Sequence, residues 1–143
     1  MGAWGEGAFE NDDAADWSGE LEGTDRDTGL EAVRSGLQAA AKTSGDDYLD
    51  SFDAAVAVAA AEIVAAMHGI NVQESPYNEE ALGWLATTNP PADDETVRLA
   101  VKALERVTAP QSELADLWDE AGDSSWRQAV DNRLASLRRL PQG

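Results

Sequence analysis

The sequence predicts an all-α fold: a compact bundle of six or seven short helices around a central Ala-rich helix at about residues 52–68. Apolar residues recur at three- and four-residue steps, which is the spacing of one helix face. No alternation of apolar and polar residues typical of a strand extends over a useful length. At 143 residues and 43% hydrophobic content, we expect a single domain over residues 1–143, with an arm at residues 1–9 that contains glycines and a tryptophan.

The first two helices carry start signals. Asn11 can cap the first helix, with Asp12 and Asp13 in the first turn, where the helix dipole favours anions. Its inward face follows at helical spacing: Ala14, Trp17 and Leu21. Thr28-x-x-Glu31 predicts a capping box at the start of the second helix, because each side chain can bond the other's backbone amide.

The third helix is expected from about Asp47 or Ser51 to His68. Its stretch Ala54–Met67 is apolar almost all round, which is typical of a helix at the centre of a domain. A bilayer span needs about 20 apolar residues, so this stretch is too short to be one. One stripe is expected to face inward: Phe52, Val56, Ala60, Ile63 and Met67. Glu62 either meets an arginine of another helix, points to a gap at the surface, or marks a site.

Four shorter helices complete the bundle. Turn and cap residues place their starts near Ser75 or Asn78, at Asp93, at Ser112, and at a second capping box, Ser125-x-x-Gln128. The break Asn89-Pro90-Pro91 separates the fourth helix from the fifth.

The net charge of −18 is unevenly distributed. Up to Thr96 the chain holds 21 acidic residues against three basic ones, whereas from Val97 onward seven acidic residues meet seven basic ones. Such a surface repels nucleic acid and anionic membranes, so we expect neither as a partner. It attracts a basic protein partner, although an acidic surface also serves solubility alone.

Side chains suited to catalysis are few. There is no Cys, which excludes disulfides and thiolate chemistry, and His68 is the single histidine. His68 precedes Gly69 at a helix end, where an imidazolium is expected to cap carbonyl groups. No phosphate-binding glycine loop and no nucleophile elbow occur, so we expect no cofactor, and a non-enzymatic role is favoured over an enzymatic one.

Carboxylate clusters leave one enzymatic alternative open. Glu10, Asp13 and Asp16 share the first helix, and Asp47 and Asp50 precede the third. If the two groups faced each other, their oxygens could hold Mg²⁺, as in a carboxylate–Mg phosphohydrolase. The alternative interpretation is that acidic residues gather in first turns because the helix dipole favours them.

The N-terminal sequence MGAWGEGAFENDDAADW (residues 1–17) is distinctive, as are SELADLWDE (112–120) and Ser125-Trp126. With these segments the chain resembles a bacterial family labelled domain of unknown function 4259. The resemblance implies a small stand-alone bacterial protein and carries over no activity. Its signature residues are Trp4, Gly5, Phe9, Asn11, Asp12 and Trp17.

The leading hypothesis is a cytoplasmic, non-enzymatic interaction protein of the inhibitor or immunity type that binds a basic protein. The residues expected to bind are Trp4, Phe9, Asn11, Asp12, Asp13 and Trp17. The alternatives are the phosphohydrolase and an oligomeric scaffold in which the arm docks on a neighbouring subunit.

Overall fold

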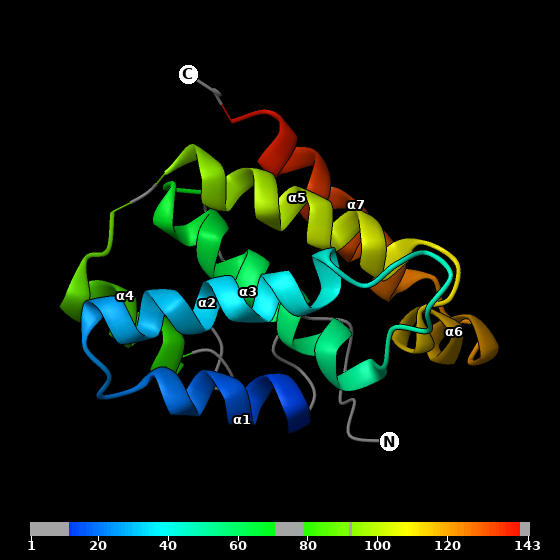
Figure 1. The fold of residues 1–143 in the computed structure, drawn as a ribbon, viewed down its shortest axis with the longest axis horizontal. Helices are drawn as coiled ribbons and strands as arrows, with labels where there is room; N and C mark the ends of the chain where they lie inside the picture. The colour runs from blue at the N-terminus through cyan, green and yellow to red at the C-terminus, as the bar shows by residue number, and fades with distance from the viewer. Residues whose placement is uncertain (1–11, 71–78, 92, 141–143) are drawn as a thin grey trace.

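The computed structural model describes residues 12–70, 79–91 and 93–140, and this part of the chain forms seven α-helices (Figure 1). In chain order they are α1 (Asp12–Leu21), α2 (Arg26–Ala41), α3 (Ser51–Met67), α4 (Glu79–Thr88), α5 (Asp94–Thr108), α6 (Glu113–Glu120) and α7 (Ser125–Arg138). Within the described ranges, the one β-type pairing is an isolated parallel bridge between Leu49 and Ser112. The predicted all-α fold class is therefore confirmed.

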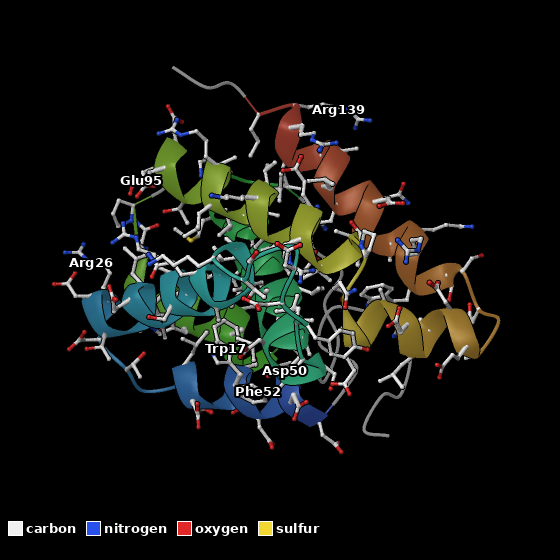
Figure 2. The ribbon with its side chains drawn as sticks, turned by 45° about the vertical axis from the view of Figure 1, so that its right-hand side comes forward. Trp17, Arg26, Asp50, Phe52, Glu95 and Arg139 are labelled. Atoms are coloured by element: carbon white, nitrogen blue, oxygen red, sulfur yellow. The ribbon has the colours of Figure 1, made fainter. Side chains whose placement is uncertain are left out.

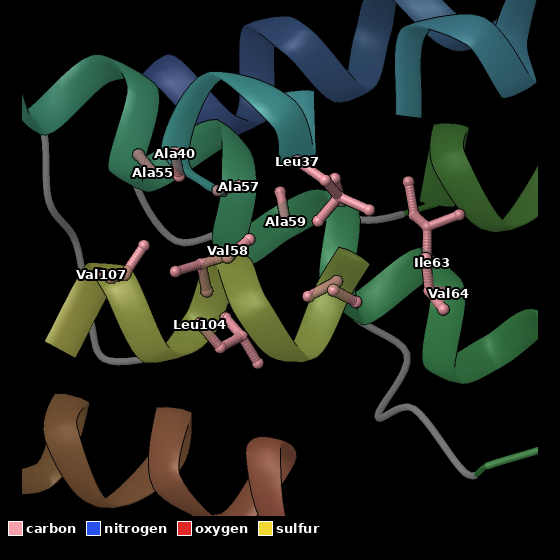
Figure 3. Packing of buried hydrophobic residues seen from close by; sticks show 14 of the residues in the cluster. Leu37, Ala40, Ala55, Ala57, Val58, Ala59, Ile63, Val64, Leu104 and Val107 are labelled. Carbon is pink, nitrogen blue, oxygen red and sulfur yellow. The ribbon is translucent and has the colours of Figure 1, made fainter. Parts of the chain in front are cut away.

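Helix α3 is the centre of the bundle, as its composition predicts. It contacts each of the other six helices, and residues 54–61 and 63–65 are buried. Figure 3 shows its small side chains between Leu37 of α2 and Leu104 of α5. Many of the buried residues are alanines, which let neighbouring backbones approach closely. No helix in the described ranges is long and apolar enough to cross a membrane.

The first turn of α3 departs from the prediction. Phe52 was expected on the inward stripe, but its side chain is 54% exposed. Full burial along α3 begins at Ala54, whereas Ser51 and Asp53 of the first turn are only partly buried. Periodicity identifies the buried face of a helix but not the point along it where its neighbours end.

Two glycines of α2 allow close helix contacts. A Cβ atom added at Gly29 would lie 2.2 Å from Cζ2 of Trp84 on α4. A Cβ atom at Gly36 would lie 2.8 Å from Cγ1 of Val56 on α3. Both distances are shorter than a real Cβ atom tolerates, so α2 can pack this closely only with glycine at these two positions.

Aspartates cap three of the helices. Asp25, Asp50 and Asp93 each accept a hydrogen bond from the backbone N–H three residues later, at 2.7, 2.8 and 2.7 Å. The predicted box at Thr28 is therefore wrong: α2 begins at Arg26, and Thr28 donates to Asp25. A carboxylate is a stronger acceptor than a hydroxyl, so the earlier aspartate takes the cap.

The second predicted box is also wrong: α7 begins at Ser125, and its N-cap residue, Ser124, makes no side-chain capping hydrogen bond. Asp123 Oδ1 accepts from both the backbone N–H and the hydroxyl of Ser125, at 2.9 and 2.6 Å. Ser112 occupies the N-cap position of α6 as expected, but its side chain makes no capping hydrogen bond.

Candidate interaction surface

Half of the predicted binding residues lie outside the described part of the chain. These are Trp4, Phe9 and Asn11, together with Glu10 of the alternative metal site. Of the others, Asp12 is exposed and Asp13 is partly exposed at the start of α1. Trp17 is half-buried and packs against the core. Binding at the junction of the arm and the first helix stays a prediction.

The alternative metal site gains no support from the described residues. Asp13 and Asp16 lie on α1, whereas Asp50 caps α3. In residues 12–70, 79–91 and 93–140, no group of three or more histidine or carboxylate side chains could hold a metal ion. The phosphohydrolase interpretation therefore also stays a prediction.

His68 occupies the C-cap of α3, where the sequence places it, but its ring does not act as expected. The backbone N–H of His68 donates to the carbonyls of Val64 and Ala65, both at 3.2 Å. The ring Nε2 is buried and makes no hydrogen bond within the described structure. The backbone N–H of His68, and not its ring Nε2, therefore closes the helix.

Glu62 meets an arginine of another helix, which is one of the alternatives that its position left open. Arg133 of α7 donates from Nε to Oε1 at 2.5 Å and from Nη2 to Oε2 at 2.9 Å. The two side chains are 15% and 19% exposed. This two-bonded ion pair explains why a charge is tolerated in the apolar segment.

Arg106 of α5 is a buried cation that the sequence did not single out. Its side chain is only 8% exposed, and its guanidinium donates to five backbone carbonyls at 2.7–3.3 Å. The acceptors come from two loops: Thr43, Ser44 and Asp47 before α3, and Pro110 and Gln111 before α6. No local sequence pattern could have identified this role, because backbone carbonyls carry no residue identity.

The loops that Arg106 joins bring the starts of α3 and α6 together. The Leu49 N–H donates to the Gln111 carbonyl at 2.8 Å, and the Glu113 N–H donates to the Leu49 carbonyl at 2.9 Å. Oε1 of Glu113 then accepts from the Ser51 N–H at 2.8 Å. Residues more than 60 positions apart in sequence therefore share one surface.

Two exposed aromatic residues and several carboxylates lie in this region, at the starts of α3 and α6. We call it the aromatic–acidic face, and it consists of Tyr48, Asp50, Phe52, Asp53, Glu113, Asp116 and Glu120. Tyr48 and Phe52 are each 54% exposed and are the exposed large hydrophobic residues of the described structure. Figure 2 labels Asp50 and Phe52 at the start of α3.

Electrostatics within the face are unfavourable to further negative charge. The Tyr48 hydroxyl donates to Oδ2 of Asp116 at 2.9 Å. This hydrogen bond, partial burial and the charges of Asp116, Glu113 and Glu120 all raise the pKa of Tyr48. Burial first, and then the charge of Asp50, raise the pKa of Asp53.

Within the described residues, the acidic side chains of the face form no ion pair with a basic side chain. The described residues form five ion pairs, and none includes an acidic residue of the aromatic–acidic face. Arg106 lies beneath the two loops, but it bonds to their carbonyl groups. The face therefore presents apolar rings and net negative charge together, an arrangement that can bind a cation carried on an apolar stem.

Comparison with known proteins gives a family and no activity. A family described as a domain of unknown function (DUF4259) matches residues 2–129. No curated protein and no solved structure shows a significant match to the chain. The match covers most of the sequence, including the three segments that carry the resemblance noted above except Met1. The chain therefore belongs to the DUF4259 family.

Proposed function

We propose that this chain is a cytoplasmic, bacterial, non-enzymatic interaction protein whose partner is a basic protein. The supporting observation is an excess of carboxylates that the fold does not neutralise. The chain has a net charge of −18, and its described residues form only five ion pairs. Complementary charge raises the association rate and suppresses wrong partners, so such a surface suits rapid, selective capture of a cationic protein.

The pairs that do form leave this excess in place. Four of them join side chains that are at least one third exposed, namely the pairs of Arg26, Arg34, Arg127 and Arg138. Exposed pairs contribute little to stability. The unpaired carboxylates repel one another and destabilise the folded chain, and a cationic partner would relieve that repulsion.

The direct test is titration of the full chain with a cationic peptide of mixed Lys and Arg content, followed by fluorescence anisotropy. A saturable complex of one peptide per chain is expected at about 50 mM salt, and it should weaken strongly by about 500 mM salt, where the screening length falls below about 5 Å. An uncharged peptide of equal length is the control. The proposal fails if the cationic peptide does not saturate, or if its affinity ignores salt.

A further inference from the structure

We infer that the aromatic–acidic face is the binding site for this basic partner, and that it recognises an arginine-bearing segment. The inference rests on the proposed function and adds to it a location and a preferred cation. It relocates recognition from residues 4–17 to the junction of α3 and α6.

The location follows from the two exposed rings. Scattered exposed apolar residues are common, but Tyr48 and Phe52 lie four positions apart on the same segment and are flanked by carboxylates. Aromatic anchors inside a polar rim are the usual centre of a protein interface. The loops beneath them are fixed by the five hydrogen bonds of Arg106, so the face is preorganised.

The preferred cation follows from the chemistry of Tyr48. Its ring is half-exposed and held by the hydrogen bond from its hydroxyl to Asp116. A cation stacked on this ring would also lie close to the Asp116 charge. Guanidinium stacks on aromatic faces and bonds carboxylates through a planar fork, whereas a strongly hydrated ammonium does neither as well. Glu113 and Glu120, whose charges also act on Tyr48, offer further acceptors.

Charge also argues against two other possible occupants of the face, a second copy of the chain and the chain's own residues 1–11. A second copy of the chain would bring two aromatic–acidic faces of the same sign together, which Coulomb repulsion opposes. Residues 1–11 carry two acidic side chains, Glu6 and Glu10, and no Lys or Arg, so their charge does not complement that of the face. A basic segment with arginines is the occupant that satisfies both the rings and the carboxylates.

The experiment compares two peptides that differ only by Arg or Lys at every basic position, titrated against the full chain at low salt. The first variant is Tyr48→Leu with Phe52→Leu, which removes the rings. The second is Asp116→Asn with Glu120→Gln, which removes two charges of the face. Its matched control is Glu31→Gln with Asp131→Asn, because these exposed acidic residues lie outside the face and the change in charge is the same.

We expect the Arg peptide to bind at least about threefold more tightly than the Lys peptide. The ring variant should lose about 5- to 20-fold in affinity for the Arg peptide, and most of its preference for Arg. The charge variant should lose about fivefold or more, against about twofold for the control. Thermal melts followed by circular dichroism establish that each variant is folded.

Two sets of results would overturn the inference while leaving the proposed function intact. In the first, peptides bind in a salt-dependent manner, but the face variants match the control or Arg and Lys bind equally. In the second, light scattering shows a dimer of the free chain that the ring variant abolishes, which makes a second copy the occupant. Absence of salt-dependent binding to either peptide defeats the proposed function itself.

Discussion

Replacing one partner of the Glu62–Arg133 pair should destabilise the protein more than replacing both. The pair is held by two hydrogen bonds, at 2.5 and 2.9 Å, and both side chains are less than one fifth exposed. Arg133→Met leaves the Glu62 carboxylate without its counterion in an apolar helix. Breaking a buried pair in this way costs about 3–5 kcal/mol. Since the pair keeps some contact with water, we expect about 3 kcal/mol.

The double variant Glu62→Met with Arg133→Met should recover most of that loss. Two unbranched apolar side chains can fill the space, and no charge is then buried. The expected free energy of unfolding lies within about 1 kcal/mol of the wild type. The interaction energy from the double-mutant cycle should therefore be about 2–4 kcal/mol.

Urea denaturation followed by tryptophan fluorescence measures these differences. A loss of about 3 kcal/mol corresponds to a fall in melting temperature of roughly 6–12 °C for a chain of this size. The Glu105–Arg138 pair is the matched control, because its side chains are 50% and 52% exposed. Arg138→Met should cost less than about 1 kcal/mol.

The reasoning about Glu62 would be refuted by either of two results. One is a cost for Arg133→Met no larger than that for Arg138→Met, which would mean that water screens the Glu62 charge fully. The other is a double variant as unstable as the single variant, which would mean that shape and not charge determines the loss.

Three further predictions follow from the packing and charge of the bundle. Arg106→Met should lower the free energy of unfolding by about 2–4 kcal/mol in urea titrations, because five carbonyls lose a charged donor; a loss below about 1 kcal/mol would contradict this. Gly29→Ala should lower the free energy of unfolding by about 1–3 kcal/mol, because the added methyl group clashes with the indole of Trp84. Gly83→Ala on α4, where the added methyl group meets no other atom, should raise it by about 0.5–1 kcal/mol. Equal effects of the two substitutions would contradict the packing argument. The pKa of Glu80 is raised by a hydrogen bond with Glu22, then by burial and by the charges of Glu22 and Glu79. The folded state therefore binds the Glu80 proton more tightly than the unfolded state does, and the free energy of unfolding falls as the pH rises through that pKa. Glu80→Gln should therefore stabilise the protein at neutral pH but not at pH values below the ordinary glutamate pKa, as thermal melts across pH would show.

Local patterns in the sequence determined the fold class and the central helix. The alanine-rich run at residues 54–65 predicts an interior helix because it is apolar almost all round, and its contacts with the six other helices of the described residues confirm this. The ends of helices were predicted less well. At Thr28 and Ser125, hydroxyl capping boxes matched the pattern. Asp25 caps α2 instead of Thr28, because a carboxylate is the better acceptor, and Ser125 lies inside α7, after its N-cap residue Ser124.

Only the tertiary structure decided which charges are buried and where the candidate surface lies. Arg133 reaches Glu62 across 71 positions, and Arg106 reaches carbonyls 59–63 positions away. The aromatic–acidic face joins a segment of the acidic two-thirds to α6 in the neutral third, so no window of sequence contains it. Periodicity and capping act over a few residues, whereas these contacts depend on how whole helices pack, which is why the sequence alone placed the candidate site elsewhere.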